Sequence, residues 1–157
     1  MDILSEIKQN TPFADKRDEI IINLRFTVNF ISKHYAKGFK KHGLTSQQYN
    51  ILRIVSGSKD PLSTHQISER MVESMSDVPR LINRLVNKKL IKKIKRKDDK
   101  RKVNITITKQ GSDLLVKLAT VLDDLREVVN LNDSEMKTLS KLLDKLRGKG
   151  SIHFGTI

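Results

Sequence analysis

Cysteine and tryptophan are absent from this chain of 157 residues, and aromatic residues make up only 4% of it. The lack of cysteine excludes disulfides, thiolate metal sites and a thiol-based redox switch. The four histidines, His34, His42, His65 and His153, are scattered without a close metal-ligand spacing, so we expect no metal site. The sequence also lacks a recognisable cluster of nucleophile, base and orienting residue, and it has no glycine-rich phosphate loop. We therefore expect neither a cofactor nor an enzymatic activity.

Long apolar runs are missing as well. No stretch approaches the roughly 18 uncharged apolar residues that suggest a membrane span, and residues 1–6 contain no basic segment followed by an apolar core. We expect a soluble, cytoplasmic protein that does not contact the membrane. The length is that of about one ordinary domain, so residues 1–157 are expected to form a single domain. Aliphatic residues in a strongly charged background favour a helical core.

Positive charge is in large excess, with a formal net charge of +13. Most of it lies between Arg84 and Lys102, where eleven basic residues stand against Asp98 and Asp99. A focused basic block favours a polyanionic partner, and the scarcity of aromatics favours a duplex backbone over stacked single strands. The simpler alternative, a solvated run of charges, stays open at this point.

Apolar spacing predicts a long helix near the start of the chain. Apolar residues recur every three or four positions from about 18 to 41, and Gly43 then ends the pattern. Thr45 and Gln48 have the form of a capping box, in which a hydroxyl and a glutamine satisfy amides at a helix start. This predicts a second helix that runs to about Ser56.

Two further helix starts follow. Ser63 and Gln66 repeat the capping pattern, so Ser63 and Thr64 are expected to cap a third, short helix. A fourth helix is expected to begin with Ser76 as its N-cap. Pro79 then falls at the third helical position, where its missing amide costs no intrahelical bond.

The period of the apolar pattern changes from helical to two after this helix. Residues 103–108 alternate strictly and are rich in β-branched side chains, and residues 90–95 form a weaker partner. These segments predict a β-hairpin with a charged tip at 97–100. Leucines at helical spacing then predict a long helix over about 113–129 and a last helix, capped by Asn132, up to about 147.

The predicted fold is mainly α with a small β-hairpin wing. A helix-turn-helix followed directly by a hairpin is a winged helix-turn-helix, here over about residues 44–111. In such a module the second helix of the pair lies in the major groove and the hairpin reaches beside it. The basic block coincides with the end of that helix and with the hairpin, which favours double-stranded DNA over the simple solvated run.

Several stretches also resemble the MarR family of transcriptional regulators. They are residues 44–52, 62–71, 80–85, 99–101 and 107–111. The most specific feature is the wing pattern, an acid two residues before an arginine and then a strand that ends in Thr-x-x-Gly. The similarity covers about residues 20–147 and looks close to a Bacteroidetes branch with the same Gln-Gln-Tyr-Asn opening.

The resemblance implies properties that composition alone does not give. The family forms homodimers through its terminal helices, here about 18–41 and 113–147, and binds pseudo-palindromic operators, so the chain is expected to act as a repressor. Many members release DNA when a small phenolic or lipophilic effector enters a cleft between the dimer helices and the DNA-binding lobe. Pro79 and Lys89 depart from the family pattern. Lys89 stands where many members have glycine, and a left-handed conformation there would cost roughly 1 kcal/mol.

Candidate DNA contacts lie on the fourth helix. Arg80 is placed to bind a guanine edge or a phosphate, with neither alternative favoured. Asn83, Ser76 and Asp77 are candidates for bases or phosphates, although capping explains Ser76 and Asp77 equally well. Arg84 is a candidate for DNA or for an internal ion pair. The sequence does not identify an effector pocket.

Candidate contacts in the wing follow from the family resemblance. Arg101 resembles the arginine that enters the minor groove, Asp99 resembles the carboxylate that orients it, and Lys100 lies in the same basic tip. The alternative for this pair is an ordinary salt bridge at a hairpin tip.

Two other functions remain open from sequence alone. An architectural protein without an effector would bind any duplex with steep salt dependence and little sequence preference. A protein-interaction module on the same scaffold would not bind DNA at physiological salt.

Overall fold

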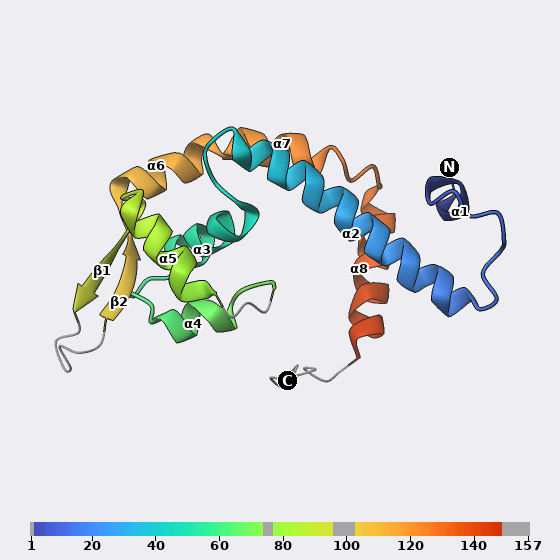
Figure 1. The fold of residues 1–157 in the computed structure, drawn as a ribbon, viewed down its shortest axis with the longest axis horizontal. Coiled ribbons are helices and arrows are strands. Elements are labelled where there is room, and N and C mark those ends of the chain that lie inside the picture. Colours follow the sequence, from blue (N-terminus) through green and yellow to red (C-terminus); the bar gives the residue numbers. More distant parts are fainter. Residues whose placement is uncertain (1, 74–76, 96–102, 149–157) are drawn as a thin grey trace. The chain divides into compact units, whose positions relative to one another are not determined.

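The computed structural model describes residues 2–73, 77–95 and 103–148. The described chain is mostly helical with one antiparallel hairpin, as the sequence predicts (Figure 1). It separates after Leu125 into two compact units, residues 1–125 and 126–157.

The first unit begins with two helices. A short α1 (Ile3–Glu6) precedes α2 (Lys16–Lys40), which starts where the Asp15 side chain accepts a hydrogen bond from the Arg17 amide. The predicted long helix is therefore confirmed and starts two residues earlier than expected. Only its C-terminal end enters the core, through the fully buried Phe39. Gly43 then takes a positive φ of 68°, which a glycine adopts without steric cost.

Both predicted capping boxes are present. The helix α3 (Ser46–Ser56) starts at Thr45, whose hydroxyl accepts from the Gln48 amide. The shorter α4 (Thr64–Glu69) starts at Ser63 in the same way, with Gln66 completing the box. These starts are set by side chains three residues apart, and for that reason the sequence predicts them well.

The start of the fourth predicted helix differs by one residue from the expectation. The helix α5 (Val78–Asn87) has Asp77, not Ser76, as its N-cap, and Pro79 is the second helical residue. The Asp77 side chain makes no capping hydrogen bond. Its backbone carbonyl instead accepts from the amides of Arg80 and Leu81, both at 3.1 Å. The prediction of Ser76 as the N-cap was wrong, because the helix begins one residue later, where the Asp77 backbone carbonyl accepts the first bonds.

The hairpin is confirmed in type and position. The strand β1 (Ile91–Lys95) pairs antiparallel with β2 (Val103–Ile107), from Ile91 opposite Ile107 to Lys95 opposite Val103. Leu62, just before α4, forms an isolated bridge with Ile105 through two backbone hydrogen bonds of 3.0 and 2.7 Å. The base of the hairpin is thus joined to the segment that precedes α4.

The predicted long helix after the hairpin is interrupted. It comprises α6 (Lys109–Lys117) and α7 (Ala119–Arg126), with the fully buried Leu118 between them. The apolar spacing continues across the join, so periodicity could not reveal it. In the second unit, α8 (Asp133–Arg147) starts at the predicted Asn132 cap, where Glu135 completes a capping box. None of the α8 residues is buried.

The core of the first unit lies among α3, α5 and the base of the hairpin. Phe39 stacks on Tyr49 with ring centroids 4.2 Å apart, which joins the end of α2 to α3. The fully buried members of this core include aliphatic residues from α3, α4, α5 and both strands: Ile51, Leu52, Ile67, Ile82, Leu85, Ile91 and Ile105. This aliphatic core holds α5 so that one of its faces stays exposed.

Candidate nucleic-acid interface

The sequence of α5 separates a buried face from a charged one. Val78, Leu81, Ile82 and Leu85 are buried, and their spacing of three and four residues places them on one side of the helix. The predicted site residues Arg80, Asn83 and Arg84 are exposed. The structure therefore gathers these three side chains on the solvent side of α5.

Arg80 has a carboxylate neighbour one turn before it. Its guanidinium lies 3.9 Å from a carboxylate oxygen of Asp77, and two-thirds of its side chain is exposed. An ion pair this exposed is worth at most about 1 kcal/mol. Asp77 can therefore position the arginine without preventing it from binding a phosphate or a base.

Asn83 is linked to the wing. The Lys93 ammonium of β1 donates a hydrogen bond of 2.8 Å to the Asn83 side-chain oxygen. The two residues are ten positions apart and belong to a helix and a strand. In the sequence, Lys93 stands out only as one charge of the basic block, and no sequence signal identifies this pairing.

The other predicted site residues lie either outside the described part of the chain or at the start of α4. Ser76, Asp99, Lys100 and Arg101 lie outside the described residues. Ser63 is confirmed as the cap of α4, while Thr64 is the first residue of that helix.

The exit of α5 is fixed by contacts with α6. Lys89 has a positive φ of 58°, the left-handed conformation that glycine most often adopts at the end of a helix. The Thr108 hydroxyl donates to the Lys89 carbonyl at 2.7 Å and accepts from the Gly111 amide at 3.1 Å. A single hydroxyl therefore caps α6 and holds the end of α5. This geometry gives the Thr-x-x-Gly pattern a structural reason.

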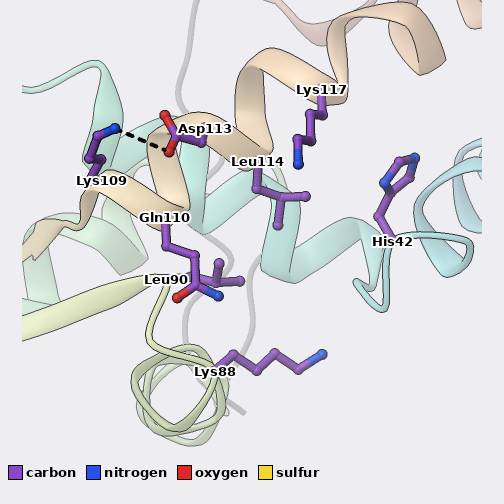
Figure 2. A pocket seen from close by; sticks show the side chains of 8 residues that line it. All are labelled: His42, Lys88, Leu90, Lys109, Gln110, Asp113, Leu114 and Lys117. Atoms are coloured by element: carbon purple, nitrogen blue, oxygen red, sulfur yellow. Dashed lines mark ion pairs between the residues drawn. The ribbon is translucent and has the colours of Figure 1, made fainter.

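A pocket of about 680 Å³ opens beside this junction (Figure 2). Its apolar residues are Leu90 and Leu114, and basic side chains from three segments lie around it. The pocket residues are His42, Lys88, Leu90, Lys109, Gln110, Asp113, Leu114 and Lys117. Lys109 is paired with Asp113 at 3.8 Å, and the Lys88 ammonium donates to the Gly43 carbonyl. The pocket combines an apolar surface with a positive rim.

Across 2–73, 77–95 and 103–148, no three His, Cys, Asp or Glu residues come together as metal ligands would. None of the helices in this part of the chain combines the length and apolar character that a bilayer crossing requires.

Comparison with known families identifies the class of protein. The family model described as transcriptional regulator SarA/Rot matches residues 33–118, which is more than half of the chain. The chain belongs to the SarA/Rot family of transcriptional regulators. A SarA/Rot regulator is a DNA-binding winged-helix protein and not an enzyme, so both of these expectations are confirmed.

Individual relatives agree with this assignment. The chain is similar to the HTH-type transcriptional regulator MgrA of Staphylococcus aureus, with 24% identity over 131 residues, or 83% of this chain and 88% of MgrA. It is also similar to the homoprotocatechuate degradative operon repressor of Escherichia coli, with 25% identity over 71% of this chain and 76% of the repressor.

Solved structures place this SarA/Rot regulator within the MarR-type fold. A MarR transcription factor from Planctomyces limnophilus has 27% identity and a TM-score of 0.65, covering 84% of this chain and 98% of that one. Bordetella bronchiseptica BpsR, studied for the regulation of its DNA binding by 6-hydroxynicotinic acid, has 20% identity and a TM-score of 0.75, covering 89% and 100%. The MarR resemblance is thus confirmed. The Bacteroidetes branch stays a prediction.

Proposed function

We propose that the chain is a repressor that binds a pseudo-palindromic operator as a homodimer. The observation that carries this proposal is the exposed face of α5, which presents Arg80, Asn83 and Arg84 and is bonded to the basic strand β1 through Asn83. In winged helices such a helix occupies the major groove. Residues 44–111 would bind DNA and residues 18–41 and 113–147 would dimerise, all within a single domain.

The wing would add a second contact. Arg101 would enter the minor groove, with Asp99 restricting its orientation and Lys100 binding a phosphate. An arginine gains there from the enhanced negative potential of a narrow groove. The basic strand β1, which leads toward this tip, supports the proposal because Lys92, Lys93 and Lys95 are exposed.

Dimerisation is supported by apolar side chains that the single chain leaves exposed. In α2 these are Ile20, Ile21, Val28 and Phe30. In α8 they are Met136, Leu139, Leu142 and Leu146, which lie three or four positions apart on one face of the helix. Helices with such faces are stable in water when a second surface covers them.

Selection from a random duplex library would test the repressor proposal. Bound duplexes would be enriched over several rounds, and the enriched sequence and a scrambled version would be titrated at two salt concentrations. The proposal expects a two-fold symmetric motif whose half-sites lie about one helical turn apart. Binding without an enriched motif would favour an architectural protein. Absence of binding at physiological salt would favour a protein-interaction module.

A small effector that releases DNA is the second proposal. The pocket beside the α5 exit supports it, because Leu90 and Leu114 offer apolar surface and Lys88 and Lys117 offer positive charge. Lys88 is the C-cap of α5, so a ligand there would act directly on the end of that helix. The regulation of BpsR DNA binding by 6-hydroxynicotinic acid also supports an aromatic effector.

A titration with named probes would test the effector proposal. DNA bound to the protein would be titrated with 6-hydroxynicotinic acid and with a panel of phenolic and lipophilic compounds. We expect at least one compound to lower the affinity for DNA. Lys117→Glu should reduce that response, whereas Lys137→Glu, an equal charge change on α8, should leave it intact. Unchanged affinity with every compound would contradict the proposal.

A further inference from the structure

The hydrogen bond between Lys93 and Asn83 determines which way the asparagine amide faces. An ammonium group has three donors and no acceptor. The atom that lies 2.8 Å from the Lys93 nitrogen must therefore be the amide oxygen of Asn83. The amide nitrogen, with its two N–H donors, is then directed away from Lys93.

This orientation changes what an asparagine can recognise. An asparagine that reads adenine uses both ends of its amide, because the nitrogen donates to N7 and the oxygen accepts from the N6 amino group. In this protein a positive charge already occupies the oxygen end. An incoming amino group would approach beside that ammonium, which repels the partly positive hydrogens of an amino donor.

The neighbouring side chains on α5 reinforce the same preference. Arg80 and Arg84 are exposed on the same helix, and a guanidinium carries five donors and no acceptor. The recognition face is therefore rich in donors around Asn83. Of the base edges in the major groove, guanine alone offers two adjacent acceptors, N7 and O6, to such donors.

We propose that Lys93 positions Asn83 as a donor, so that Asn83 selects guanine instead of adenine in the operator. Lys93 acts here as a positioning residue, because it determines the base preference through Asn83. The inference rests on the proposed function, since it requires α5 to lie in the major groove of a specific site.

Lys93→Met is the variant that tests this inference, with Lys92→Met as its matched control. Lys92 is exposed on the same strand and has the same charge, but adjacent strand residues point to opposite faces. Both variants lose one positive charge, so both should lose similar affinity for random duplex. Only Lys93→Met releases the Asn83 oxygen. Lys93→Arg keeps a donor at the same position.

The experiment is a selection from a random duplex library with the full-length protein and each variant, after circular dichroism has confirmed that the variants are folded. Asn83→Ala first identifies the base pair that depends on Asn83, because that position loses its preference. At this position we expect guanine for the wild type, for Lys92→Met and for Lys93→Arg. For Lys93→Met we expect a shift toward adenine of roughly 5- to 150-fold, the range of one good bidentate contact.

The outcomes separate the two proposals. If the wild type enriches no motif, the proposed operator binding fails, and this inference fails with it. If a motif is enriched but the Asn83-dependent base is adenine in the wild type, the inference alone is overturned. The same holds if Lys93→Met keeps the wild-type preference, or if Lys92→Met changes it equally.

Discussion

Gly111 at the start of α6 lies directly against the backbone carbonyl of Leu90. A Cβ atom at position 111 would be 2.1 Å from that oxygen and 2.9 Å from a side-chain carbon of Ile107. Only a residue without a side chain fits there. Because Leu90 immediately precedes β1, this contact sets how closely α6 approaches the base of the wing.

Replacement of Gly111 by alanine should therefore destabilise the fold. The added methyl group meets a backbone atom, which cannot move aside as a flexible side chain does. We expect Gly111→Ala to lower the free energy of unfolding by at least about 2 kcal/mol in urea denaturation. Gly57→Ala is the control, because its Cβ would be 3.3 Å from the Arg53 carbonyl and its φ of −78° suits any residue. If the two variants had the same free energy of unfolding, the close contact between position 111 and the Leu90 carbonyl would not limit the side chain there.

A substitution at Lys89 should raise the stability of the fold, in contrast to the substitution at Gly111. Its φ of 58° strains any residue that has a Cβ atom, and glycine removes this strain. We expect Lys89→Gly to raise the free energy of unfolding by about 1 kcal/mol. Lys89→Ala removes the same charged side chain and keeps the Cβ atom, so it should bring no such gain. A stability gain in both variants would assign the effect to charge.

The Thr108 hydroxyl accepts from the Gly111 amide and donates toward the carbonyls of Lys89 and Leu90, and a methyl group can do neither. Thr108→Val should lose both the cap of α6 and the bond to the Lys89 carbonyl. We expect a loss of about 1 to 2 kcal/mol in the free energy of unfolding. Thr108→Ser keeps the hydroxyl and should lose much less, as thermal or chemical denaturation would show.

The apolar face of α8 gives a test of dimerisation. Leu139→Glu combined with Leu142→Glu should weaken the dimer by roughly tenfold or more, because both side chains would carry charge into the buried surface. Light scattering at micromolar concentration would measure the change. Lys141→Glu lies on the same helix and should leave the dimer largely intact. A wild-type protein that is itself monomeric would refute the proposal.

The wing gives a prediction whose sign separates two mechanisms. Arg101→Ala should weaken operator binding by on the order of 1 to 3 kcal/mol. The slope of the logarithm of the binding constant against the logarithm of the salt concentration should become shallower by about one, the value for one lost phosphate contact. Asp99→Ala should also weaken binding, although it makes the wing more positive, because the arginine loses its orientation. Titrations on operator and random duplex would decide, with Lys137→Ala as a control. Tighter operator binding by Asp99→Ala would leave only a diffuse basic patch.

Features set by neighbours in the chain were predictable from the sequence. The capping boxes at Thr45 and Ser63 require only side chains three residues apart, and the hairpin requires only a change of period. The start of α5 at Val78 was missed because the bonds at this start go to the Asp77 backbone carbonyl, which no side-chain pattern marks in the sequence. The break at Leu118 was missed because apolar spacing continues through it.

The candidate site was predictable in part. The exposure of Arg80, Asn83 and Arg84 follows from helical periodicity. The bond between Lys93 and Asn83 does not, because it depends on how β1 packs beside α5 and on the rotamer of one lysine among many. Sequence patterns identify the face of a helix, whereas a contact between elements needs their packing.

The bridge between Leu62 and Ile105 fixes the base of the hairpin at a constant distance from the helices of the first unit. A hairpin joined to the body only at its two ends could swing toward or away from the duplex to suit different sites. Here β2 is held at a third point, next to the start of α4, by two backbone hydrogen bonds. The separation between α5 and the base of the hairpin is therefore set by the protein itself. In the proposed binding mode, an operator with one extra base pair between the parts contacted by α5 and by the wing would have to twist or bend to be bound.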